Sequence, residues 1–167
     1  MSSPAETRSP AQHIPTLAAA LDREGFPKGD RAKLRRMGAA GPAPLAFHRF
    51  VIRHVDARWQ GEHWIPAWRT LICALAIPAR SAYDPRTPLG LALAKVRFSE
   101  GRFERLVASD GATFHTLLLR AARQLSAKGQ RADWRIAAAL LFAPNETARD
   151  AVNLRFARDY YRKRVEE

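Results

Sequence analysis

The sequence predicts an all-α protein, a multi-helix bundle of about eight to nine helices. Three observations support this prediction. Alanine and leucine dominate the apolar positions, as is typical of helices, whereas valine and isoleucine are sparse. No stretch alternates apolar and polar side chains as a half-buried strand does. Apolar residues recur instead every three or four positions, which is the spacing of one helix face.

The beginning of the chain differs from the rest. Residues 1–12 are rich in serine, proline and alanine and show no apolar periodicity. Such a composition cannot bury enough apolar surface to order a segment. The sequence therefore predicts a disordered tail over 1–12 and a single all-helical domain over 13–165.

Four helices are predicted in the first half of the domain. The first ends at Gly25, and Asp30 occupies the N-cap position of a short basic helix that runs to Met37. A loop separates it from a helix over about 45–55. The fourth helix has a continuous apolar stripe, formed by Trp64, Trp68, Leu71, Ile72 and Leu75.

The second half begins with the longest internal loop, because the prolines at 78, 85 and 88 disfavour a helix interior. Short helices are predicted over 89–96 and 103–107. A longer helix follows, and its apolar face consists of Phe114, Leu117, Leu118, Ala121 and Leu125. The last two helices are predicted to begin after the N-caps Asp133 and Asn145, and Pro144 keeps them apart.

The charge is strongly positive. The chain has 28 Lys and Arg against 16 Asp and Glu, which gives a formal net charge of +12. A compact domain with this excess repels itself, and a polyanionic partner offsets the repulsion. A compositional bias toward arginine and alanine accounts for the arginines but not for the shortage of acidic residues. The charge therefore indicates a role with nucleic acid.

Several classes of protein are disfavoured. The lone Cys73 lies in an apolar run, which excludes an internal disulfide framework and fits a reducing compartment. No apolar stretch is long enough to span a membrane, and the N-terminus lacks the apolar core of a secretory signal. We therefore expect a cytoplasmic protein with no membrane association.

No catalytic, metal or cofactor motif is present. The five histidines form no HExxH and no pair near further ligands. The chain also lacks a phosphate-binding Gly-rich loop and a Gly-x-Ser-x-Gly nucleophile turn. The sequence predicts a protein that is not an enzyme and that binds neither a metal nor a cofactor.

Two basic clusters are candidates for phosphate contacts. The first lies on the short second helix. The second is an arginine stripe on the last helix, at spacings of three and four residues. Arginine can bind phosphate with two hydrogen bonds, although such residues can also merely solvate a helix face. Most aromatic residues lie on apolar faces, with Trp59 and Tyr161 as exceptions, so contact with the backbone rather than with bases is expected. The clusters are Arg31, Lys33, Arg35 and Arg36, and Arg155, Arg158 and Arg162.

Five segments, in order, resemble the CasB family, the small subunit of the type I-E CRISPR Cascade complex. Each is weakly specific alone, and their order and spacing over about 14–162 carry the resemblance. The segments are Gly29–Arg36, Pro44–Arg49, Leu89–Ala94, Ser99–Asp110 and Asp133–Trp134.

The resemblance implies two helical bundles packed as one body and no catalytic activity. It also implies two copies stacked head to tail, in contact with the repeated backbone subunits and the large subunit of Cascade. The basic surface of the family is thought to hold the displaced non-target DNA strand, near the CRISPR RNA and its target, and so to stabilise the R-loop.

Carried over by motif position, Arg36, Arg49, Arg102 and Arg120 are the phosphate-contact candidates. The family's basic pair between its last two helices is missing, because Pro144 and Asn145 stand there. Arg149, or the stripe Arg155, Arg158 and Arg162, could substitute for it. The alternative function is a free-standing basic helical RNA-binding factor, of the antitermination or ribosome-associated kind.

Overall fold

The computed structural model describes the backbone of residues 8–165 and the side chains of residues 8–163. This part of the chain is predominantly helical, which confirms the predicted fold class, with nine α-helices, two 3-10 turns and two short strands. The elements are α1 (Pro10–Asp22), α2 (Lys28–Arg36), α3 (Leu45–His54), η1 (Ala57–Trp59), η2 (Glu62–Trp64), α4 (Ile65–Ala76), β1 (Tyr83–Pro88), α5 (Leu89–Lys95), α6 (Glu100–Ala108), α7 (Gly111–Ala127), β2 (Ala132–Asp133), α8 (Arg135–Leu141) and α9 (Glu146–Val165).

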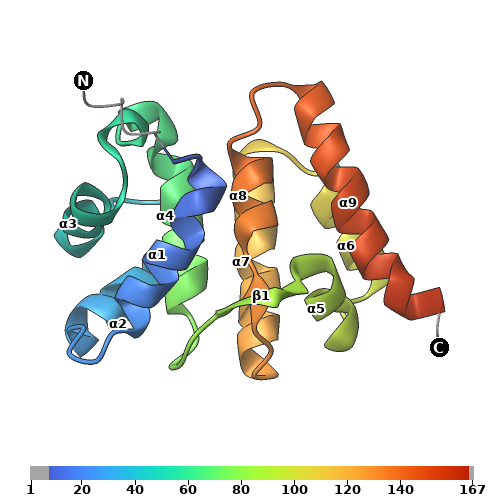
Figure 1. The fold of residues 1–167 in the computed structure, drawn as a ribbon, viewed down its shortest axis with the longest axis horizontal. Coiled ribbons are helices and arrows are strands. Elements are labelled where there is room, and N and C mark those ends of the chain that lie inside the picture. The colour runs from blue at the N-terminus through green and yellow to red at the C-terminus, as the bar shows by residue number, and fades with distance from the viewer. Residues whose placement is uncertain (1–7, 166–167) are drawn as a thin grey trace, which may run out of the picture.

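The helices form two groups that pack against each other. Helices α1 to α4 make one group and α5 to α9 the other, as Figure 1 shows. Helix α1 packs against α8, and α4 packs against both α7 and α8. One continuous hydrophobic cluster includes side chains from both groups, among them Trp68 of α4 and Phe156 of α9.

Helix α4 supplies the centre of this cluster, as its apolar stripe predicts. Trp68, Leu71, Ile72 and Leu75 are all at most 1% exposed. Cys73 is also fully buried, and burial raises the pKa of its thiol. The interpretation of this cysteine as an unreactive core residue fits both observations.

The predicted boundary of the N-terminal tail is wrong at its C-terminal end. Residues 1–7 lie outside the described residues, but α1 already begins at Pro10. Ser9 caps the helix: its hydroxyl accepts from the N–H of Gln12, and the Gln12 side chain accepts from the N–H of Ser9. Proline is favoured at the first helical position. The Ser-Pro-Ala-Gln segment is therefore a helix start, although its composition resembles that of a tail.

The predicted N-cap of the second helix is also wrong. Helix α2 begins at Lys28, directly after Pro27, and Asp30 lies within its first turn. In this position the positive end of the helix dipole stabilises the negative charge of the Asp30 carboxylate. Asp30 also forms an ion pair with Arg49 of α3, with an N–O distance of 3.3 Å.

The predicted loop after α4 contains a strand. β1 pairs in parallel with β2, in an irregular register that places Tyr83 opposite Ala132 and Pro88 opposite Asp133. Two groups donate to the Ala82 carbonyl, the N–H of Ala132 at 3.1 Å and the Trp134 indole at 3.2 Å. The prolines are tolerated because this two-stranded pairing uses few N–H donors.

The two predicted caps near the C-terminus have different outcomes. The Asn145 side chain accepts from the N–H of Ala148 at 2.8 Å, which confirms it as the cap of α9. The residue in the N-cap position of α8 is Trp134 rather than Asp133. Asp133 instead accepts from the N–H and the guanidinium of Arg135.

Candidate nucleic-acid interface

The predicted contact arginines lie on three separate surfaces. One is a groove between α8 and α9, the second is a pocket between α6 and α7, and the third is the exposed side of α2 and α3. The groove and the pocket share no lining residue. They contain Arg155, Arg158 and Arg162 (groove), Arg102 and Arg120 (pocket), and Arg36 and Arg49 (α2 and α3).

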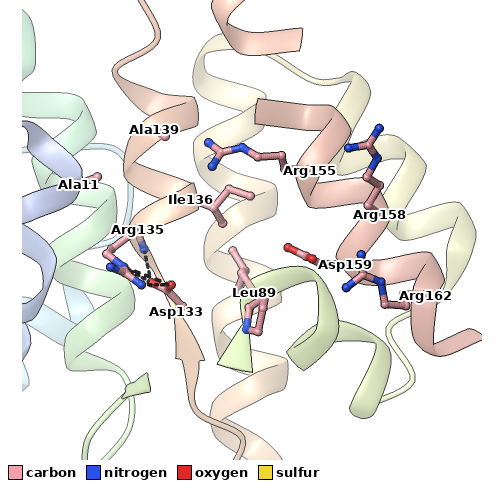
Figure 2. Close-up of a pocket in the computed structure, with 11 residues that line it drawn as sticks. Ala11, Leu89, Asp133, Arg135, Ile136, Ala139, Arg155, Arg158, Asp159 and Arg162 are labelled. Carbon is pink, nitrogen blue, oxygen red and sulfur yellow. Dashed lines mark hydrogen bonds and ion pairs between the residues drawn. The ribbon is translucent and has the colours of Figure 1, made fainter. Parts of the chain in front are cut away.

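The groove is a cavity of about 550 Å³ bounded by α8, α9 and the start of α5. Arg155, Arg158 and Arg162 project from α9, and Arg135 from α8. Figure 2 shows Arg155 reaching across from α9 toward α8, while Arg158 lies on the outer side. Within the described residues, no carboxylate lies within 4.0 Å of the three α9 guanidinium groups. Their charges are therefore available to an anion in the groove.

Two carboxylates also line the groove. Asp133 is paired with Arg135 at 2.8 Å, so these two charges offset each other. Asp159 lies between Arg155 and Arg162 along α9 and points into the groove (Figure 2). Burial raises the pKa of Asp159, although the two arginines favour its charged form. The groove thus combines an excess of arginine with one poorly solvated carboxylate.

The pocket between α6 and α7 measures about 320 Å³. Arg102 and Arg120 both line it, so the structure brings these two candidates together. Arg105 joins them one turn after Arg102 on α6. It was not among the predicted contact residues, although its i+3 spacing from Arg102 places both on one side of a helix. Gln124 accepts from the Arg102 guanidinium at 3.2 Å and orients it. Three arginines without a carboxylate among the lining residues form an anion-binding arrangement.

Arg36 and Arg49 belong to neither the groove nor the pocket, because they lie on α2 and α3 in the first helical group. Arg36 is exposed and is the last residue of α2. Arg49 is exposed on α3, and its guanidinium pairs with Asp30. The ion pair neutralises part of the charge that Arg49 offers to a phosphate.

Other arginines of the basic clusters serve the fold. Arg31 donates to the carbonyls of Leu21 at 2.7 Å and Pro78 at 2.6 Å, which ties α2 to α1 and to the segment after α4. Arg149, considered as a substitute for the missing basic pair, donates to the Ser109 carbonyl at 2.5 Å and covers the ring of Phe114. We therefore leave both out of the candidate interface.

The two aromatic exceptions are also engaged within the fold. The Trp59 indole donates to the Arg8 carbonyl at 2.8 Å, and its ring packs against Trp64 and Phe142. The Tyr161 hydroxyl donates to Glu100, and burial together with this hydrogen bond raises its pKa to about 12. Both side chains are therefore half-buried and hydrogen-bonded within the fold rather than free on the surface.

No group of three or more His, Cys, Asp or Glu side chains within residues 8–163 is placed to hold a metal ion. His13, the fully buried histidine, uses both ring nitrogens: Nδ1 lies 2.7 Å from the Ser9 carbonyl and Nε2 accepts from the N–H of Asp56. In the same described range, every helix is too short or too polar to cross a membrane.

Comparison with known proteins gives four results. The family model described as CRISPR-associated protein Cse2 matches residues 30–161. A chain of a structure titled "CRISPR RNA-guided surveillance complex" is similar in fold, with a TM-score of 0.68 and 24% identity over 95% of this chain and 99% of that one. The crystal structure of CasB from M. ruber has a TM-score of 0.65 and 21% identity over 95% of each chain. A search of curated proteins found no match.

Proposed function

The chain belongs to the CRISPR-associated Cse2 family, and on this premise we propose that it holds the phosphate backbone of the displaced DNA strand and so stabilises the R-loop. Membership confirms the resemblance to CasB that the sequence predicted. Membership of this family supports a place for the chain as a subunit of a CRISPR surveillance complex of the Cascade type. The proposed role is non-catalytic, and the proposed partners are the other Cascade subunits, a second copy of the chain, single-stranded DNA and the hybrid of CRISPR RNA with its target.

The observation that carries the proposal is a set of six arginines, three from α9 in the groove and three in the pocket, that have no carboxylate partner among the described residues. Arg155, Arg158 and Arg162 extend over seven residues of α9, or about 10 Å of helix axis. A row of this kind can contact successive phosphates without reading bases. Arg102, Arg105 and Arg120 offer a second contact point in the pocket.

These contacts matter energetically because R-loop formation is a nearly balanced exchange. The RNA–DNA hybrid that forms is about as stable as the DNA duplex that it replaces, so modest protein contacts to the backbone shift the equilibrium. We include Arg36 in the proposed strand path because it is exposed and forms no ion pair within the part of the chain that the structure describes. We leave Arg49 out, because Asp30 pairs with it and two exposed aliphatic side chains flank it.

Replacing the three α9 arginines together (Arg155→Ala, Arg158→Ala, Arg162→Ala) is expected to weaken binding of single-stranded DNA. Each lost phosphate contact should reduce the slope of log K against log salt by about 0.7, or about 2 for the three. The measurement is fluorescence anisotropy of a labelled oligonucleotide at several salt concentrations. The variant Arg102→Ala, Arg120→Ala tests the pocket in the same way.

Arg86→Ala provides the matched control. Its side chain is 81% exposed and pairs with Asp84, and it lies outside the groove and the pocket. The salt slope should stay at the wild-type value. If the α9 variant shows an unchanged slope while Arg86→Ala reduces it, the strand does not follow the groove.

Asp159→Asn is expected to strengthen binding of the same oligonucleotide by about two- to fivefold. The change removes a negative charge that lies between Arg155 and Arg162 in the groove, and it preserves the shape of the side chain. The gain should disappear in the α9 triple variant. Equal gains in both backgrounds would mean that Asp159 acts outside the groove.

A further inference from the structure

The outer side of α3 carries an uncommon pair of exposed aliphatic side chains. Among the described residues, three large hydrophobic side chains are classed as exposed: Leu45 at 75%, Ile52 at 67% and Leu154 at 53%. Two of these three therefore lie on one ten-residue helix. Single exposed aliphatic residues are ordinary on protein surfaces, but a matched pair on one face indicates an interaction site.

The pair has the geometry of a helix–helix seam. Leu45 and Ile52 are seven residues apart, so they point in the same direction about 10 Å apart along the axis. Seven residues is the repeat with which two helices interlock apolar side chains. The opposite side of α3 is already used, because Phe47 and Phe50 are buried in the core. Figure 1 shows α3 at the outer edge of the first helical group, where a partner has access.

The charge around the pair defines the chemistry of the partner. Helix α3 contains Arg49 and Arg53 and no carboxylate of its own. Both arginines are exposed on the side of α3 that carries Leu45 and Ile52. Asp30 pairs with Arg49 and offsets part of its charge, whereas Arg53 has no carboxylate partner among the described residues and supplies most of the free positive charge. A phosphate backbone would match the arginines but would leave the aliphatic side chains uncovered. A helix with an aliphatic seam and acidic flanks matches both features.

We propose that this surface, which we call the α3 face (Leu45, His48, Arg49, Ile52 and Arg53), docks an acidic amphipathic helix of another protein subunit. The α3 face is thus a protein contact, whereas the arginines of the groove and the pocket hold nucleic acid. The identity of the partner as a subunit of the same complex rests on the proposed function. The assignment of the face to protein rests on the α3 side chains alone.

Site-specific crosslinking in the assembled complex tests the occupant. Ile52→Cys can be labelled with a benzophenone maleimide, because Cys73 is fully buried and does not compete for the reagent. Thr116→Cys, on the exposed side of α7, is the control position. After irradiation, mass spectrometry should identify a peptide of another subunit that is rich in Asp and Glu and has aliphatic residues at helical spacing. A crosslink to nucleic acid, a crosslink to a second copy of this chain, or a yield no higher than at the control position would each overturn the proposal.

A charge-introducing variant separates this proposal from the strand-binding role. Leu45→Glu with Ile52→Glu should reduce incorporation into the complex at least about tenfold, since it places charge in the seam and opposes acidic flanks. The isolated variant should keep the wild-type thermal stability and the wild-type salt slope for single-stranded DNA. Leu154→Glu, a similar change on α9, should not reduce incorporation to this extent.

Wild-type incorporation of the double variant, or a loss of DNA binding in its isolated form, would refute the docking role. If the α9 arginine variant keeps full DNA binding while the α3 variant fails to assemble, the strand-binding role alone is wrong.

Discussion

Replacing Arg69 by methionine is expected to lower the free energy of unfolding by about 3–5 kcal/mol, because the substitution removes a buried guanidinium that holds the connection between α2 and α3. Arg69 lies in the middle of α4 and is 6% exposed. It donates to four carbonyls of that connection: Met37 at 2.6 Å, Gly38 at 2.8 Å, Ala40 at 2.6 Å, and Gly41. Methionine fills much of the same volume but donates no hydrogen bond.

The backbone of the connection explains why a guanidinium is needed. Gly38 and Gly41 have φ values of +62° and +83°, in the left-handed region that favours glycine. This conformation turns several carbonyls toward α4 at the negative end of the α2 dipole. Five N–H groups in a planar fork can meet them, whereas an ammonium offers three donors from one point. Arg69→Lys should therefore lose a substantial part of the same stability.

Urea denaturation followed by circular dichroism measures the change, and limited proteolysis reports opening of residues 37–44. Arg80→Met is the matched control, since Arg80 is exposed, and the change should stay within about 0.5 kcal/mol of wild type. An Arg69→Met variant as stable as Arg80→Met would show that water satisfies the four carbonyls at little cost.

Replacing Gly90 by alanine is expected to destabilise the protein by about 1–3 kcal/mol, despite the higher helix propensity of alanine. Helix α5 lies directly on α9. A Cβ atom at position 90 would lie 2.5 Å from the Phe156 carbonyl, 2.8 Å from the Tyr160 nitrogen and 2.9 Å from the Asp159 Cβ. Two of these atoms belong to the backbone of α9, so relief requires that the helices move apart.

The same movement should affect the groove, because Leu89 and the α9 arginines line it. We expect Gly90→Ala to weaken binding of single-stranded DNA as well as stability. Gly101→Ala is the control: Gly101 lies in α6, and the added methyl group would come within 4 Å of no atom beyond its own stretch of that helix. It should be neutral or should stabilise the protein by up to about 1 kcal/mol. Thermal melts of both variants give the comparison, and equal melting temperatures would mean that α5 and α9 adapt to the methyl group without loss.

The sequence predicted the helices best where apolar periodicity was strong. Most of the α4 stripe and of the α7 face lies in the core, and the Asn145 cap is confirmed by its hydrogen bond. Trp64 and Leu117 are the exceptions: Trp64 lies in η2 before α4, and both side chains are only half-buried. The errors are at the ends and in the connections. The composition of residues 9–12 predicted a disordered tail, but Ser9 and Gln12 form a capping box. The prolines at 78, 85 and 88 predicted a loop, but this segment contains strand β1. Local composition did not resolve these cases, because β1 depends on pairing with β2 about fifty residues away.

For the arginines of the candidate site, too, the sequence predicted some properties correctly and did not reveal others. Their number and the shortage of carboxylates indicated a polyanionic partner, and helical spacing placed Arg155, Arg158 and Arg162 in one row. Spacing did not reveal that Arg69 and Arg149 are bound by carbonyls or that Arg49 is paired with Asp30. Spacing also did not predict that Arg135 lines the groove, since that residue belongs to α8 rather than to α9.

The sequence by itself determined the helical class, most of the core stripe and the net charge, because each depends on composition or on residues close together in the chain. It also determined the family, because the family is recognised from the order and spacing of short segments along the chain. Only the tertiary structure decided which arginines remain free. A guanidinium is engaged by the carboxylates and carbonyls that the fold brings within hydrogen-bonding distance. The separation in sequence is 47 residues for Arg31 and Pro78, 19 for Arg49 and Asp30, and 31 for Arg69 and Gly38. The tertiary structure likewise decided that Gly90 must be glycine, since the atoms that exclude a side chain there belong to a helix more than 60 residues later.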